Sequence, residues 1–176
     1  MSEFMEQPDA VAVRAATEKD AAPLAALAQR LAGTDPFLVV SGVDPVTGVS
    51  LLKEGIRLGE ENGVARIFVT ESDGEIAGFA ICRRHPAPER DGILQLDLAV
   101  DGRYRRRGLG SALIGQAVHW ARDNAMYRVQ LAVVADNGPA IALYEKNGFA
   151  TEGTLRNGFR LGDQLHDVHV MARLLK

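Results

Sequence analysis

The chain has little cysteine, no long apolar run and no large excess of charge of either sign. Its single cysteine, Cys82, excludes an internal disulfide and a metal cluster built from cysteine ligands. No window approaches the roughly 18 apolar residues that a membrane-spanning helix needs, so we expect no membrane partner. The formal net charge of −3 argues against a nucleic-acid partner, so any basic site must be local.

The N-terminus also lacks the apolar stretch of a secretory signal, because residues 1–9 are polar and carry Glu3, Glu6 and Asp9. We expect residues 1–9 to be a polar tail and residues 10–176 to form a single domain. The apolar share of 47% and the charged share of 24% are typical of globular proteins, and the chain is long enough to bury a substantial core. The expected location is the cytoplasm.

Hydrophobic periodicity divides the chain into alternating strand-like and helix-like segments. Strand patterns occupy residues 11–15, 66–71, 76–83, 93–100, 129–134, 149–155 and 166–174. Helical patterns occupy roughly residues 20–32, 49–61, 109–124 and 138–146. Antiparallel hairpins on either side of one strand–helix–strand crossover predict an α/β or α+β fold with a single mixed sheet.

The connections between these segments have recognisable turn chemistry. Asp73-Gly74 is typical of a tight hairpin, because both residues tolerate a positive φ. Residues 34–48, which contain several Pro and Gly, are expected to form a loop. Arg156-Asn157-Gly158 and Gly162-Asp163 are expected to join the last two strands.

The most informative segment runs from Arg105 to Gly110, between an apolar strand pattern and an apolar helix pattern. A helix that begins here presents unpaired backbone N–H groups and the positive end of its dipole. Gly108 and Gly110 let an anion approach that backbone closely. Arg105, Arg106 and Arg107 add forked donors that suit phosphate oxygens, so the segment predicts a pyrophosphate site.

Two familiar nucleotide-binding motifs do not fit this segment. A dinucleotide fingerprint needs a third glycine where the chain has Leu113, and it belongs on the first strand of a fold rather than past the middle of the chain. A Walker loop needs Gly-Lys-Ser/Thr, which the sequence does not contain. The pattern that is present, Arg-x-x-Gly-x-Gly, is short and is weak evidence when taken alone.

A second segment, Asn137 to Phe149, follows about 27 residues after Gly110 and reads NGPAIALYEKNGF. In this order the two segments resemble the GNAT superfamily of acyl-CoA-dependent N-acyltransferases. The resemblance is strongest over roughly residues 75–155 and implies a GNAT-like α/β (α+β) fold. Such a fold has one mixed, mostly antiparallel sheet of about seven strands, flanked by about four helices. The implied cosubstrate is acetyl-CoA, with no metal.

The resemblance also assigns residues to the donor. Arg105 to Gly110, including Leu109, with Ser111, match the loop that wraps the coenzyme A pyrophosphate through backbone N–H groups. Leu98 and Val100 match the strand whose exposed backbone pairs with the pantetheine arm. Asn137 matches a side chain that hydrogen-bonds the pantetheine region, although it could equally serve only as a helix cap.

The implied chemistry is direct transfer of the acetyl group to a primary amine within a ternary complex. Tyr144 matches the tyrosine that protonates the departing thiolate, although its spacing from Ile141 also suits an ordinary core residue. A backbone N–H near Val100 could stabilise the oxyanion. Asp97 alternates with Leu96 and Leu98 and is the candidate general base, with a structural carboxylate or a base supplied by water as alternatives.

Other residues offer no competing site. His166 and His169 lie three apart in a strand pattern, so they face opposite sides and do not form a metal pair. The acceptor is expected to be a small molecule such as an amino acid, an amine or an antibiotic-like compound. A protein N-terminus or lysine is the alternative, and a non-catalytic acyl-CoA-binding module is the rival from another class. A homodimer is compatible with the resemblance.

Overall fold

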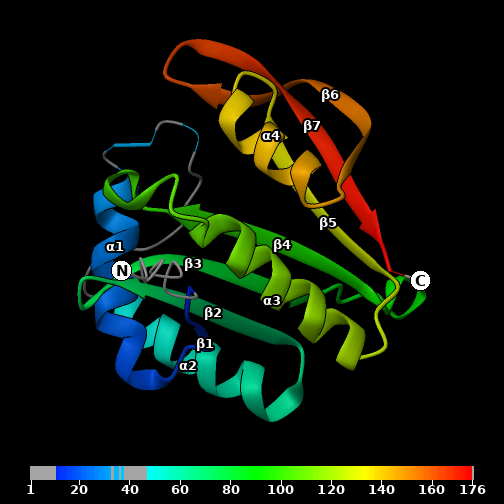
Figure 1. The fold of residues 1–176 in the computed structure, drawn as a ribbon. Helices are drawn as coiled ribbons and strands as arrows, with labels where there is room; N and C mark the ends of the chain where they lie inside the picture. Colours follow the sequence, from blue (N-terminus) through cyan, green and yellow to red (C-terminus); the bar gives the residue numbers. More distant parts are fainter. Residues whose placement is uncertain (1–10, 33, 36, 38–46, 176) are drawn as a thin grey trace, which may run out of the picture.

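The structure, a computed structural model, describes residues 11–32, 34–35, 37 and 47–175. It contains seven strands, four α-helices and three short 3-10 turns (Figure 1). The strands are β1 (Val13–Ala15), β2 (Ala65–Ser72), β3 (Glu75–Arg84), β4 (Ile93–Val100), β5 (Arg128–Val134), β6 (Ala150–Leu161) and β7 (Gln164–Leu174). The helices are α1 (Ala21–Ala32), α2 (Thr47–Asn62), α3 (Leu109–Asp123) and α4 (Gly138–Lys146).

The strands form one mixed sheet in the order β1-β2-β3-β4-β5-β7-β6. Every neighbouring pair is antiparallel except β4 and β5, which are parallel because α3 carries the chain back across the sheet between them. The expected α+β fold with a single mixed sheet is therefore confirmed. None of the helices in the described ranges is long and apolar enough to cross a membrane.

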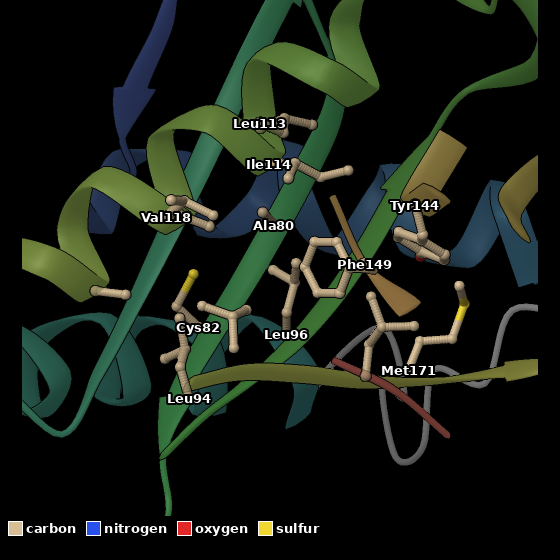
Figure 2. Close-up of a cluster of buried hydrophobic side chains, with 14 of the residues drawn as sticks. Ala80, Cys82, Leu94, Leu96, Leu113, Ile114, Val118, Tyr144, Phe149 and Met171 are labelled. Atoms are coloured by element: carbon tan, nitrogen blue, oxygen red, sulfur yellow. The ribbon is translucent and has the colours of Figure 1, made fainter. Parts of the chain in front are cut away.

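The two faces of the sheet are covered by different helices. Leu24 and Leu27 of α1 and Ile56 of α2 pack against Val69 and Phe79 on one face. On the other face, α3 and α4 cover a larger core, whose members include the following side chains: Ala80, Cys82, Leu94, Leu96, Leu113, Ile114, Val118, Tyr144, Phe149 and Met171 (Figures 1 and 2). Alternate residues of each central strand thus serve separate cores, which fixes the face to which every site residue points.

Two expected boundaries were wrong. Helix α2 begins at Thr47, so the last two residues of the expected loop 34–48 belong to a helix. Arg156-Asn157-Gly158 does not join two strands but forms an irregularity inside β6, and the turn lies only at Gly162-Asp163. Asn157 has φ +52°, and its N–H donates to the Asp167 carboxylate of β7 at 2.9 Å, so a turn-like conformation is absorbed without breaking the hairpin.

Several other local expectations are confirmed. Asp73 and Gly74 have φ +54° and +79° in a two-residue hairpin turn between β2 and β3. Gly148, with φ +83°, follows the end of α4. The polar tail at residues 1–9 and residues 38–46 of the expected loop lie outside the residues that the structure describes.

Candidate active site

The centre of the sheet opens between its two parallel strands. β4 and β5 are paired only at Ile93–Arg128, Leu94–Val129 and Gln95–Gln130, and the register ends there although both strands continue (Figure 1). Beyond Gln95, the edge of β4 that faces β5 therefore has no strand partner within the described ranges.

The β3–β4 register shows which backbone groups line this opening. Asp101 N–H donates to the Ala77 carbonyl at 2.8 Å, so Asp101 belongs to a hydrogen-bonded pair of the antiparallel ladder. Because such pairs alternate along the strand, Leu98 and Val100 direct their N–H and C=O groups away from β3 and toward the opening. The register therefore leaves this edge of β4 open at Leu98 and Val100, and pairing of these groups with a pantetheine arm stays a prediction.

The arginine–glycine turn lies at the end of this opening, directly before α3. Gly108, with φ +81°, is the residue that caps α3, a conformation that glycine adopts without strain. Arg106 has φ +66°, which is unusual for a residue with a side chain and which occurs in backbone that clamps ligands. Since Gly108 has no capping side chain, the first N–H groups of α3 are left for an incoming anion.

The three arginines of the turn are exposed, and two of them contact acidic or polar side chains. Arg105 donates to Asp35 at 2.8 Å, and Arg107 donates to the Ser72 hydroxyl at 3.2 Å. The Arg107 guanidinium also lies 5.3 Å from the centre of the Tyr104 ring. These contacts are on the surface, where ion pairs contribute little stability, so the guanidinium groups can exchange them for phosphate.

A buried carboxylate that sequence reasoning missed anchors the turn. Asp101 accepts from the backbone N–H of Arg103 at 3.0 Å, from the Arg103 guanidinium at 2.9 Å and from Arg30 of α1 at 3.2 Å. The hydrogen bonds from Arg103 hold the pKa of Asp101 near 2. The sequence does contain a signal for this anchor, because Asp101 is an acidic residue at the end of a strand, directly before a basic turn.

The start of α3 is joined closely to α4. A Cβ on Gly110 would lie 2.8 Å from Leu143 Cδ2, so the second glycine permits close packing of the two helices. Ser111 accepts a hydrogen bond from the Asn147 side chain at 3.1 Å. The turn is therefore fixed relative to the helix that carries Tyr144.

Tyr144 lies in the core beneath this joint, where its ring packs against Phe149 with centroids 5.9 Å apart (Figure 2). Its residue surface is 7% exposed, and no hydrogen bond from its hydroxyl is found within the described part of the chain. Burial raises the pKa of the phenol to about 12, and the charges of Asp97 and Asp35 act in the same direction. The phenol therefore keeps its proton at neutral pH.

The structure gives Asn137 a structural partner. Its side-chain oxygen accepts from the Ala140 N–H at 3.3 Å and caps α4, with Pro139 in the first turn as expected. The side-chain NH₂ group of Asn137 takes no part in this cap. A contact between this group and the pantetheine arm stays a prediction.

Asp97 lies on the opposite face of β4 from Leu96 and Leu98, as its alternation predicted. Its side chain is 48% exposed and forms an ion pair with Arg83 of β3. On the same face, Gln130 of β5 donates to Gln95 of β4 at 3.3 Å. The sheet thus separates the α3–α4 face, with Tyr144, from a second face that carries Asp97.

The remaining titratable groups do not form a metal site in the described residues, where no cluster of three or more candidate ligands occurs. Cys82 is fully buried, and burial raises its pKa to about 12, as expected for an inert thiol. His169 contacts Thr154 at 2.9 Å and His166 contacts Asp136 at 2.6 Å, so the two histidines are apart as predicted.

Known proteins share both the sequence and the architecture of this chain. The pattern of the Acetyltransferase (GNAT) family matches residues 43–149. The L-amino acid N-acetyltransferase AaaT of Escherichia coli is 33% identical over 127 residues, which are 67% of this chain and 73% of that protein. The [Ribosomal protein bS18]-alanine N-acetyltransferase of Escherichia coli is 33% identical over 105 residues, covering 60% and 68%.

A crystal structure of a GNAT-family acetyltransferase from Streptococcus pneumoniae superposes with a TM-score of 0.86 at 28% identity, and the match covers 95% of this chain and all of that one. The opening between β4 and β5 and the glycine-capped turn before α3 lie within the segment that the family pattern matches. This protein is a member of the GNAT family and is an N-acetyltransferase.

Proposed function

We propose that the enzyme acetylates the primary amine of a free amino acid or a similar small amine, by direct transfer in a ternary complex. The observation that supports this acceptor class most directly is the similarity to an L-amino acid N-acetyltransferase over two-thirds of the chain. The proposed setting is the cytoplasm. Because the chain belongs to a family of acetyltransferases, an enzyme is favoured over the alternative of a non-catalytic module that only binds acyl-CoA.

The donor half of the proposed site follows the opening in the sheet. Arg105, Arg106 and Arg107 and the first N–H groups of α3 are suited to bind the diphosphate of acetyl-CoA. The backbone groups of Leu98 and Val100 are suited to bind the amides of the pantetheine arm, as an added strand would be bound. Tyr144 lies on the same face of the sheet as α3.

Tyr144 is the proposed general acid. A group that must deliver a proton to a leaving thiolate has to be protonated beforehand, and a phenol with its pKa raised to about 12 meets that condition at neutral pH. A backbone N–H of the open β4 edge near Val100 is the proposed stabiliser of the oxyanion. Holding both substrates in one cleft contributes further rate through orientation.

Proton removal from the amine is assigned to Asp97 or to water. Asp97 is on the face away from the donor helices, where an amine would approach, but its carboxylate is held by Arg83. Asp97→Asn separates these two possibilities. A large loss of kcat with unchanged donor affinity supports Asp97 as the base, whereas near-normal kcat supports water.

A thiol-release assay with acetyl-CoA tests the acceptor class, using the common L-amino acids, small primary amines and alanine-led peptides in parallel. We expect release with amino acids or small amines and identify the product by its added acetyl mass. Release only with peptides would instead support the second candidate, a protein N-terminal acetyltransferase. The similarity to the ribosomal-protein enzyme over 60% of this chain is the observation that favours that candidate.

A further inference from the structure

His166 of β7 is a partly buried histidine that the proposed chemistry does not use. Its side chain is 14% exposed, and its Nδ1 lies 2.6 Å from Asp136 Oδ2. Its Nε2 is buried and has no hydrogen-bond partner among the residues that the structure describes. Because buried polar atoms in folded proteins are nearly always paired, an unpaired one indicates a missing partner.

The strand register places the His166 side chain on the face of the sheet that carries Asp97, where the proposed acceptor would approach. Gln95 of β4 pairs with Gln130 of β5, which pairs with Ala172 of β7, so these three share a face with Asp97. Counting in steps of two along β7 from Ala172 brings His166 to that same face. His169, three residues away, falls on the opposite face.

Two neighbours hold the His166 ring in one orientation. Asp136 follows β5, directly before the Asn137 cap of α4, and its carboxylate can only accept, so Nδ1 carries a proton. Phe37, from the segment after α1, meets the ring edge-on with centroids 6.4 Å apart and an angle of 83°. Phe37 is in turn held near the donor turn, because its N–H donates to Asp35, which pairs with Arg105.

Two other polar side chains of this face are already paired. Asp97 is paired with Arg83, and Gln95 is bonded to Gln130. An imidazole with Nδ1 bound to a carboxylate can accept a second proton at Nε2 without losing that bond, and the resulting N–H is a strong donor to an anion. A free amino acid carries such an anion close to its reacting amine.

We propose that His166 binds the carboxylate of the acceptor through Nε2, with Asp136 and Phe37 as its positioning residues. This inference rests on the proposed amino-acid acceptor. It makes His166 a specificity-determining residue that distinguishes amino acids from amines without a carboxylate.

The test compares each L-amino acid that the enzyme acetylates with its own carboxamide, which keeps the amine and loses the charge. In the wild type, kcat/KM is expected to favour the acid. His166→Leu should raise KM for the acid by about 10- to 100-fold, the loss of one charge-assisted hydrogen bond, with kcat and coenzyme A affinity nearly unchanged. KM for the carboxamide should change little, so the preference for the acid disappears.

His166→Gln keeps an N–H donor, so its KM for the acid should lie between those of the wild type and His166→Leu. A purely structural role of His166 would not produce this intermediate KM. His169→Gln is the matched control on the opposite face and should leave the acid-to-amide ratio unchanged. If His166→Leu does not fold, His166→Gln and Asp136→Asn take its place in the test. Each of these two substitutions should lower the ratio of kcat/KM for the acid to kcat/KM for the carboxamide.

Three results would overturn the inference. These are an unchanged acid KM in His166→Leu, an equal rise for acid and carboxamide, or a fall in kcat in place of a rise in KM. Each of them leaves amino-acid acetylation itself intact. A wild type that acetylates small amines but no amino acid would also overturn the inference and leave the proposed function standing. Failure to acetylate either class would remove the proposed function.

Discussion

Leu143 of α4 occupies the space that a side chain on Gly110 of α3 would need, with only 2.8 Å between Leu143 Cδ2 and the position of an added Cβ. The contact joins the helix that starts at the arginine–glycine turn to the helix that carries Tyr144. The proposed donor turn and the proposed acid are therefore joined through direct packing of two helices.

Gly110→Ala should destabilise the protein by about 1–2 kcal/mol, because the added methyl displaces Leu143 in a tightly packed joint. Gly115→Ala in the same helix is the matched control, since nothing lies within 4 Å of its added Cβ. The control should stabilise the protein by about 0.5–1 kcal/mol through helix propensity. Urea unfolding measures both, and equal effects of the two substitutions would contradict the packing argument.

Replacing Arg106 and Arg107 together by glutamate should weaken coenzyme A binding by at least about tenfold, because two cations near the diphosphate become anions. Isothermal calorimetry at low salt gives the dissociation constant. Arg90→Glu with Arg122→Glu makes the same charge change away from the turn and should have little effect. An unchanged affinity in the first variant would remove the diphosphate assignment.

Tyr144→Phe should lower kcat by about 100-fold or more, since it removes the proposed proton donor, while coenzyme A affinity is retained. Tyr127→Phe is the control, because that tyrosine is half exposed on the surface. A rate for Tyr144→Phe close to that of the wild type would show that the thiolate leaves without this acid.

The same tyrosine makes stability depend on alkaline pH. Its pKa is near 10 in the unfolded chain and about 12 when folded, so the folded state binds the proton more tightly. Stability from this group is complete below pH 10 and is lost as the pH rises toward 12. Unfolding titrations should show the wild type losing stability relative to Tyr144→Phe over that window.

Asp101→Asn should destabilise the fold by about 2 kcal/mol at neutral pH, because it removes the charge that Arg103 and Arg30 share at the end of β4. The pKa of Asp101 is lowered by Arg103 from 3.8 to about 2. The stabilisation is therefore present above pH 4 and lost as the pH falls toward 2, so the gap to the wild type should close there. Asp123→Asn, on an exposed helix end, is the control and should show no such gap.

Much of the fold was predictable because its signals are local. The Asp73-Gly74 turn, the Asn137 cap and the stop at Gly148 each depend on backbone conformations that a few neighbouring residues determine. The error at Arg156-Asn157-Gly158 has the same origin. Turn-forming residues also form bulges, and the pairing of Asn157 with Asp167 on another strand decides between the two.

Local sequence patterns were sufficient to predict the order of strands and helices, the turn with its three arginines and the family to which these segments belong, because each depends on adjacent residues. Three other relationships depend on the assembled fold: β4 and β5 separate after Gln95, Arg83 pairs with Asp97, and Asp136 binds one ring nitrogen of His166. These relationships join residues far apart in the chain. Their outcome depends on register, sheet face and competition among partners, which local patterns do not encode.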